Sequence, residues 1–138
     1  MNREIRRQVR ERAGVRCEYC HIAPPAYKAF CIDHVVARQH GGKTALDNLA
    51  FACLHCNAHK GPNVAGTDQQ TGELVRLFDP RKDDWTEHFA WSGATLIGLT
   101  AIGRATIHVL AINEPAFLEV RQILLIEQSG PAEEPLPL

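Results

Sequence analysis

Apolar side chains near the start of the chain follow the period of a helix. Ile5, Val9 and Ala13 recur every fourth residue, and charged or polar residues fill most of the positions between them. This spacing places the three side chains on one face of a helix over residues 3–13, and Gly14 is a favourable residue to end it. The sequence therefore predicts a helix that packs one apolar face against a core.

Between residues 30 and 62 the pattern changes to two short apolar runs followed by a short helix. The runs are rich in apolar and β-branched residues, which favour strands. The polar segment that connects them contains Gly41 and Gly42, which supply a permissive backbone. The pair Gly61-Pro62 ends the helix. The predicted order is a strand at 30–37, a loop at 38–48, a strand at 49–52 and a helix at 54–60.

The second half of the chain has a weaker pattern of mixed strands and helices. Trp85, Phe89 and Trp91 supply large apolar surfaces for whatever core this half forms. Thr100 is a favourable N-cap for one helix, and Pro115 is a favourable first residue for another. The predicted elements are a polar loop at 63–72, strands at 74–78 and 94–99, and helices at 100–112 and 115–128.

These patterns predict an α+β fold for the 138 residues, of which 45% are apolar. We expect residues 1–62 to form the core unit and residues 63–128 to form a small α+β extension packed on it. Residues 129–138 are rich in proline and acidic side chains, which predicts a disordered tail. No apolar run approaches the ~20 residues of a membrane span, and no signal-peptide pattern follows the N-terminus, so we expect a cytoplasmic protein.

Four of the five cysteines form two pairs with metal-ligand spacing. Cys17 and Cys20 make one Cys-x-x-Cys knuckle, and Cys53 and Cys56 make the other. Two-residue spacers allow both sulfurs of a knuckle to face one metal, and two such knuckles are typical of a tetrahedral four-thiolate zinc site. In a reducing cytoplasm these pairs indicate metal ligands before disulfides. The sequence therefore predicts one structural Zn²⁺ that joins the first helix to the helix at 54–60.

An Asp-His pair lies between the knuckles and is not needed to hold zinc. Histidine is the side chain whose unperturbed pKa suits a general base near neutral pH, so His34 is the candidate base. Asp33 and Asn57 offer hard oxygen ligands for a cation such as Mg²⁺ or Mn²⁺. A cation held by only these two keeps positions for water and phosphate oxygens, as metal-assisted phosphodiester cleavage requires. Asn48 is expected to fix the loop by local hydrogen bonds and so to hold His34 in place.

Charge is unevenly distributed, although the net charge is only -1. Residues 1–69 contain ten Lys and Arg against six Asp and Glu, whereas residues 70–138 contain five against ten. The basic half also contains the cysteines. Its excess of positive charge predicts that this half binds a polyanion. Because four thiolates on one Zn²⁺ would remove two charges, we expect the binding of nucleic acid to be weak and non-specific.

The arginines of the first helix are the main candidates for phosphate contacts, with a solvated helix face as the alternative. We expect Glu4 and Glu11 to do little to neutralise them. A lysine on the helix at 54–60 is a further candidate, because that helix also carries the proposed cation ligand. The expected nucleic-acid contacts are Arg6, Arg7, Arg10 and Lys60.

Taken together, these residues resemble a known family over about residues 5–62. The segment contains C-E-Y-C, then I-D-H-V-V-A-R-Q-H-G-G-K-T-A-L-D-N-L, then C-L-H-C-N-A-H-K-G. This is similar to an HNH endonuclease domain of the zinc-stapled type. The resemblance implies a ββα-metal fold and hydrolysis of DNA with a single divalent metal. It implies His34 as the general base, Asp33 as the metal ligand, Asn48 as the middle asparagine and Asn57 as the third motif residue, an H-N-N variant.

The C-terminal half resembles an extension of small stand-alone bacterial HNH proteins, in L-F-D-P-R-K-D-D-W-T-E-H-F-A-W and I-G-L-T-A-I-G-R-A-T. Two alternatives remain open at this point. A non-catalytic zinc-ribbon module that binds nucleic acid or protein would account for the cysteines, but not for the Asp-His pair and the two asparagines. An interaction protein that docks a protein partner through its C-terminal half would account for the acidic charge there.

Overall fold

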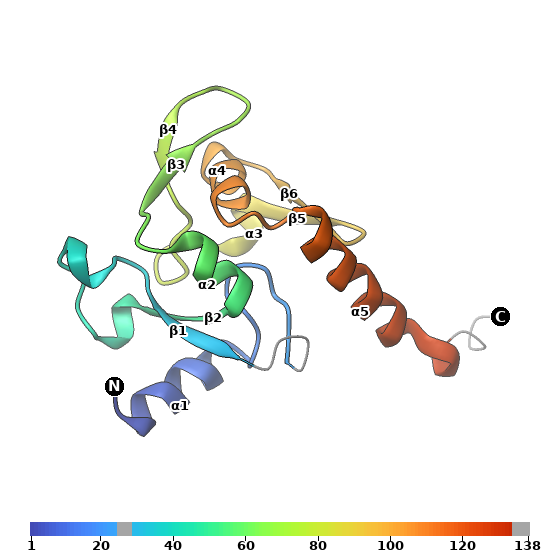
Figure 1. Cartoon of the computed structure of the whole chain (residues 1–138), viewed down its shortest axis with the longest axis horizontal. Helices are drawn as coiled ribbons and strands as arrows, with labels where there is room; N and C mark the ends of the chain where they lie inside the picture. The colour runs from blue at the N-terminus through green and yellow to red at the C-terminus, as the bar shows by residue number, and fades with distance from the viewer. Residues whose placement is uncertain (25–28, 134–138) are drawn as a thin grey trace.

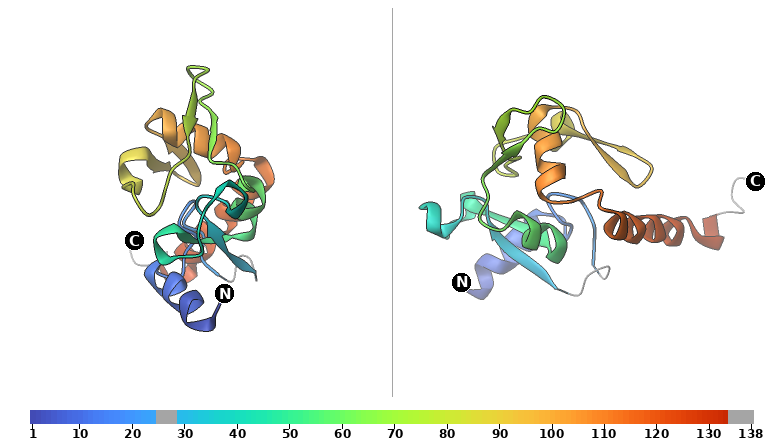
Figure 2. Two further views of the ribbon diagram at one scale, coloured as in Figure 1. Left: turned by 90° about the vertical axis from the view of Figure 1, so that its left-hand side faces the viewer. Right: turned by 45° about the horizontal axis from the view of Figure 1, so that its top comes forward.

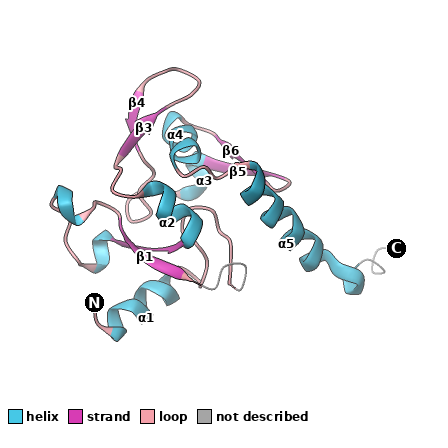
Figure 3. Cartoon of the chain, viewed as in Figure 1, coloured by secondary structure: helices cyan, strands magenta, loops and turns pink. Residues whose placement is uncertain are grey.

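The structure is a computed structural model that describes residues 1–24 and 29–133. In this part of the chain, helices alternate with three two-stranded antiparallel sheets (Figures 1 and 3), as the predicted α+β class requires. The elements are α1 (Arg3–Arg12), β1 (Phe30–His34), β2 (Leu49–Cys53), α2 (Leu54–Lys60), β3 (Ala65–Thr67), β4 (Leu74–Arg76), α3 (Trp85–His88), β5 (Phe89–Ser92), β6 (Thr95–Gly98), α4 (Ala101–Val109) and α5 (Pro115–Glu133), with short 3-10 turns at Arg38–His40 and Leu46–Asn48.

In the N-terminal unit the β1–β2 hairpin lies between α1 on one side and α2 on the other (Figure 1). Val9 of α1 is buried against Leu49 and Phe51 of β2, and Ile5 and Ala13 pack at the margin of this cluster. This is the apolar face that the four-residue spacing predicts. The structure therefore has the strand, loop, strand and helix order expected from the sequence.

Polar contacts fix α1 at both ends. The Asn2 side chain caps the helix by accepting a hydrogen bond of 2.8 Å from the backbone N–H of Ile5. The Arg12 guanidinium donates to the carbonyl oxygens of Leu46 and Leu49, at 2.8 Å and 2.6 Å. Arg12 thereby ties the end of α1 to the chain segment that enters β2.

One buried cluster joins the N-terminal unit to the C-terminal half. The Trp85 indole donates to the Tyr19 carbonyl at 3.0 Å, and Arg81 forms an ion pair with Glu18 in the first knuckle. The C-terminal half therefore packs on the N-terminal unit through a shared core. Buried members of this core from the two halves are Tyr19, Ile22, Val35, Leu77, Phe78, Phe89, Leu96, Leu110, Ile112 and Phe117.

Within the C-terminal half, α4 contacts the β3–β4 hairpin and strand β6. The buried Thr106 hydroxyl of α4 accepts from the Phe78 N–H at 2.9 Å and donates to the Ile102 carbonyl at 2.7 Å. The Asn113 side chain pairs with the backbone of Leu96 in β6, accepting from its N–H at 3.0 Å and donating to its carbonyl at 2.7 Å. The α5 helix then extends away from the rest of the molecule (Figure 2).

Several predicted boundaries need correction. Strand β1 ends at His34 and not at residue 37, because the chain turns into the loop there. The sequence pattern did not predict β3, β5 or α3, which are only three or four residues long. Helix α5 runs to Glu133, so residues 129–133 are helical and not part of a disordered tail. The rest of that predicted tail, residues 134–138, lies outside the described residues.

Among the described residues, no helix combines the length and the apolar character needed to cross a membrane.

Candidate active site

The four knuckle cysteines converge. Their sulfur atoms all lie within 4.8 Å of one another, and all four side chains are buried. Each knuckle is closed by N–H···S hydrogen bonds: Cys17 accepts from Tyr19 at 3.4 Å and from Cys20 at 3.5 Å, and Cys53 accepts from Cys56 at 3.4 Å. Four buried sulfurs without oxygen donors fit Zn²⁺, so the residues could hold the predicted ion.

The electrostatics of this cluster agree with a metal site. Burial raises the pKa of the Cys20 and Cys56 thiols well above the ordinary value, because a thiolate is poorly solvated there. The pKa of Cys17 is instead lowered, because hydrogen bonds from the neighbouring thiols outweigh its burial. A divalent ion among the four sulfurs would favour their thiolate forms and would fix the start of α2 against the loop that follows α1.

A separate cavity of about 260 Å³ opens where β1 ends. Three of the predicted site residues line it together: Asp33 and His34 come from the end of β1, and Asn57 comes from the middle of α2. Neighbours within a regular strand point to opposite faces, but His34 is the last residue of β1 and is not held to that alternation. The remaining lining residues are Ile32, Ala37, Arg38, Gly61 and Pro62.

Asp33 is buried and bonded on two sides. Its Oδ2 accepts a hydrogen bond of 2.8 Å from the Tyr19 hydroxyl, and the Lys60 ammonium lies 3.1 Å from the same oxygen and 3.3 Å from Oδ1. Burial raises the pKa of Asp33, and the Lys60 charge and the Tyr19 hydrogen bond oppose that shift. Burial and the adjacent Asp33 carboxylate raise the pKa of Tyr19 well above its usual range. The tyrosine hydroxyl therefore keeps its proton and acts as the donor.

Lys60 does not lie where the sequence placed it. The side chain is only 1% exposed, and its ammonium donates to the carbonyl oxygens of His34 and Val35 at 3.2 Å and 3.1 Å as well as to Asp33. These carbonyls lie where β1 ends, and an ammonium with three donors can satisfy them and the carboxylate together. The expected surface contact between Lys60 and phosphate is thus corrected: Lys60 supports the end of β1 from inside.

His34 is partly exposed beside the cavity. Its Nε2 lies 2.9 Å from the Thr44 hydroxyl oxygen, across the loop that follows β1. This contact orients the imidazole ring. A histidine that lines an open cavity and has one ring nitrogen held by a hydrogen bond is suited to serve as a general base.

Asn48 fixes the loop, as the sequence predicts. Its Oδ1 accepts from the Val36 N–H at 2.9 Å, and its Nδ2 donates to the carbonyls of Val36 and Lys43 at 3.0 Å and 2.9 Å. Gly42 leaves space for these hydrogen bonds, since a Cβ atom added at this position would lie 1.7 Å from the Val36 carbonyl oxygen. Asn48 is therefore placed to support His34 through the loop, and it is not one of the residues that line the cavity.

The arginines of α1 are not equivalent. Arg7 forms ion pairs with both Glu4 and Glu11, so the expectation that these acids do little to neutralise the helix is wrong for Arg7. Arg6 and Arg10 are exposed and remain candidates for phosphate contact. Two further exposed cations, Arg38 and Lys43, lie in the loop that follows β1.

Sequence reasoning missed three residues of the site. Arg38 lines the cavity, Thr44 contacts His34, and Tyr19 contacts Asp33. Arg38 could have been found from its place four residues after His34, in a loop with a second cation, Lys43. Tyr19 and Thr44 carry no such local signal, because their partners are distant in sequence.

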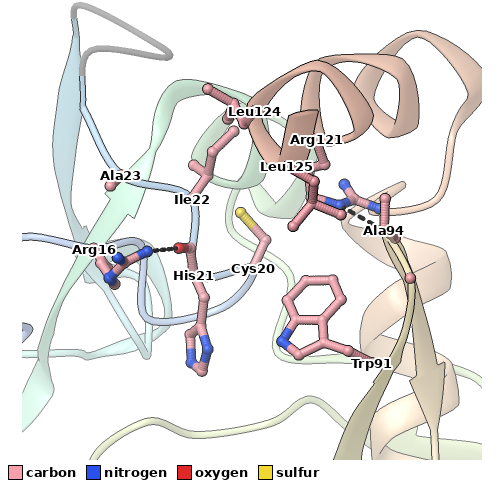
Figure 4. Close-up of a pocket in the computed structure, with 11 residues that line it drawn as sticks. Arg16, Cys20, His21, Ile22, Ala23, Trp91, Ala94, Arg121, Leu124 and Leu125 are labelled. Carbon is pink, nitrogen blue, oxygen red and sulfur yellow. Dashed lines mark hydrogen bonds between the residues drawn. The ribbon is translucent and has the colours of Figure 1, made fainter. Parts of the chain in front are cut away.

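A larger cavity of about 450 Å³ lies between the first knuckle, the β5–β6 turn and α5 (Figure 4). Its walls are mainly apolar, with Ile22, Trp91 and Leu124 among them. The Arg121 guanidinium at its edge is bonded to the Ala94 and Ile112 carbonyls, at 2.9 Å and 2.7 Å. Over the described residues its lining includes no carboxylate, so it offers no site for a hard divalent cation.

Comparison with known families agrees with the resemblance predicted from the motifs. A family model described as HNH endonuclease matches residues 17–63. The match begins at the first knuckle cysteine and ends just after α2, so it includes both knuckles, the cavity and the loop, and excludes α1 and most of the C-terminal half. No curated protein and no solved structure gives a significant match to the chain.

Proposed function

We propose that this chain, through the segment that matches the HNH endonuclease family, hydrolyses phosphodiester bonds in DNA with Mg²⁺ or Mn²⁺. One observation carries the proposal: Asp33, His34 and Asn57 line a single open cavity. Two of them offer hard oxygen donors, and the third offers a base. The four-cysteine cluster lies apart from this cavity and serves as the structural zinc site.

Each side chain has a definite task in this scheme. Asp33 and Asn57 bind the divalent cation, which when bound stabilises the charge that develops on the phosphate. His34 removes the proton from the attacking water at Nδ1, while Thr44 holds its Nε2. Asn48 keeps the loop, and with it the His34 ring, in the required position. Arg38 offers a cation to a phosphate oxygen at the mouth of the cavity.

The nucleic-acid surface is small in this proposal. Arg38 and Lys43 are exposed in the loop beside His34, and Arg6 and Arg10 are exposed on α1. Four cations on a chain of net charge -1 support weak, non-specific and salt-sensitive binding to DNA. The proposal also places this protein in the bacterial cytoplasm. Its acidic C-terminal half would contact a protein partner.

A plasmid cleavage assay tests the function. Brief EDTA treatment and desalting should abolish cleavage, while zinc content and the thermal melt stay unchanged, because four thiolates hold zinc far more tightly than two oxygen ligands hold Mg²⁺. Addition of Mg²⁺ or Mn²⁺ alone should restore activity. Activity that returns only with Zn²⁺ and follows zinc content would contradict the separation of the two metal sites.

The base has its own test. His34→Ala should lower cleavage at saturating Mg²⁺ by ~10²–10⁴, the usual effect of losing a general base, with little change in DNA affinity. His108→Ala is the matched control, because His108 is exposed on α4 in the C-terminal half. If His34→Ala cleaves like the parent protein, His34 is not the base. Zinc-loaded protein that binds DNA but never cleaves it would favour the non-catalytic zinc module instead.

A further inference from the structure

Tyr19 occupies a position that the proposed chemistry has not yet used. It lies between the two cysteines of the first knuckle and is only 1% exposed. Its N–H donates to the Cys17 sulfur, its carbonyl accepts from the Trp85 indole, and its hydroxyl donates to Asp33. One residue thus contacts the zinc cluster, the C-terminal half and the cation-binding carboxylate.

We propose that Tyr19 is a positioning residue for the divalent cation, acting through Asp33. The inference rests on the proposed function, because it needs Asp33 to be a cation ligand. Ligands of metal ions are commonly oriented by a second group that hydrogen-bonds to them, and such groups tune metal affinity. Tyr19 does this from the zinc knuckle, so the structural metal site sets the geometry of the catalytic one.

The bonds around Asp33 explain why Tyr19 is needed. The Lys60 ammonium approaches both carboxylate oxygens, at 3.1 Å and 3.3 Å, and therefore distinguishes little between them. The Tyr19 hydroxyl, at 2.8 Å from Oδ2, selects one orientation. A carboxylate has about four lone-pair sites, so these partners leave capacity for a cation. Asp33 lines the cavity together with His34 and Asn57, from which a cation could reach it.

The Tyr19→Phe variant removes the hydroxyl and keeps the ring. We expect one zinc per chain and a cooperative melt, as in the parent protein. Affinity for Mn²⁺, measured on the protein alone by electron paramagnetic resonance, should fall by ~10–100-fold. Cleavage should fall at low Mn²⁺ and recover at high Mn²⁺, a dependence that a purely structural role would not produce.

A matched control removes a different buried hydroxyl. Thr106→Val deletes the hydroxyl that bonds to Phe78 and Ile102 inside the C-terminal half. It should lower the melting temperature and leave Mn²⁺ affinity unchanged. A folded, zinc-loaded Tyr19→Phe protein with parental Mn²⁺ affinity overturns the inference.

A second measurement decides the matter if Tyr19→Phe does not fold. The chain has two tyrosines, so Tyr27→Phe leaves Tyr19 as the one signal in protein labelled with ¹³C at the tyrosine Cζ. Titration with Mg²⁺ should shift this signal, with the midpoint found for Mg²⁺-dependent cleavage. A signal that does not move at saturating Mg²⁺ overturns the inference. A parent protein that neither binds Mn²⁺ nor cleaves DNA instead refutes the proposed function itself.

Discussion

Two buried aspartates in this molecule, Asp33 and Asp68, have different surroundings. Asp33 lies in the N-terminal unit at 5% exposure, and Asp68 lies in the turn of the β3–β4 hairpin at 0%. Each forms an ion pair, Asp33 with Lys60 and Asp68 with Arg104. Asp33 lines a cavity together with His34 and Asn57.

The two carboxylates differ in the hydrogen bonds that they accept and in the shift of their pKa. Asp68 accepts two bonds from Arg104, at 2.8 Å and 3.0 Å, one from the Gln70 N–H at 3.1 Å and one from the Thr71 hydroxyl at 2.8 Å. These donors, Arg104 foremost, hold the pKa of Asp68 well below its usual range. Burial instead raises the pKa of Asp33, against the opposing effect of Lys60 and Tyr19. Both carboxylates are thus buried and paired, and they differ in the number of hydrogen bonds that they accept and in the direction in which their pKa is shifted.

The change with the largest expected effect removes a ligand of the four-cysteine site that lies next to Asp33 through Tyr19. Cys53→Ser deletes one of four ligands, and structural zinc contributes an apparent ~10–16 kcal/mol in small sites, which is comparable to the ~5–15 kcal/mol stability of a whole domain. Because the two halves share one core, both should unfold together. Circular dichroism melts and zinc analysis test this, and a soluble Cys53→Ser protein with a cooperative melt would contradict the structural zinc.

The same substitution at Asp33 and at Asp68 should have different effects on cleavage. Asp33→Asn should lower cleavage by at least ~10²-fold, because a catalytic metal supplies several kcal/mol of transition-state stabilisation. Asp68→Asn should leave cleavage per folded molecule near the parental value. Plasmid cleavage at saturating Mn²⁺, normalised to folded protein, measures both. Equal losses in the two variants would show that the distinction between the carboxylates is wrong.

Asp68 should affect how the stability of the protein depends on pH, and it should not affect cleavage. Since its pKa is lowered by folding, the ionised form stabilises the native state at neutral pH, and this contribution is fully present above the unfolded pKa of ~4. It is lost as the pH falls below that value towards the folded pKa. Asp68→Asn should therefore melt several degrees below the parent protein at pH 7 and pH 5, and the gap should narrow at pH 3. A gap that stays constant down to pH 3 would contradict the assignment.

The smallest expected effect concerns the arginines of α1. They differ in whether a carboxylate of the same helix pairs with them. Arg7 is paired with Glu4 and Glu11, whereas Arg6 and Arg10 are exposed. Replacing Arg6 and Arg10 by Gln should reduce the slope of log affinity against log salt by up to ~0.9 for each phosphate that the variant no longer neutralises. Arg7→Gln is the control and should change the slope less. Identical slopes in all variants would mean that α1 does not face the DNA.

The parts of the site that could be predicted are those encoded by spacing along the chain. Cys17 and Cys20, three positions apart, predict a knuckle because the loop between them can bend in only a few ways. His34 was proposed from its place in an Asp-His pair between the knuckles, and Asn57 from its place directly after the last knuckle cysteine. Thr100 was recognised as a helix cap, and its hydroxyl does accept from the Gly103 N–H at 3.0 Å.

The parts that could not be predicted depend on contacts between distant segments. Lys60 looks like a surface cation in a seven-residue helix, and only the position of that helix over the end of β1 turns its ammonium inward. Strand β3 is three residues long, too short for a periodic pattern, and it forms where Gly66 packs tightly against Val109 of α4. In both cases tertiary packing, and not local preference, decides the outcome.

The pairing of Asn113 with β6 also bears on how the protein behaves at high concentration. A strand at the edge of a sheet can recruit a strand from another molecule, which is a common first step in aggregation. Here the Asn113 amide occupies both backbone groups of Leu96 and so takes the place of an incoming strand. The neighbouring Ile97 is 41% exposed and would otherwise favour such an encounter. The Asn113 amide therefore blocks this part of the β6 edge against pairing with a strand from another molecule.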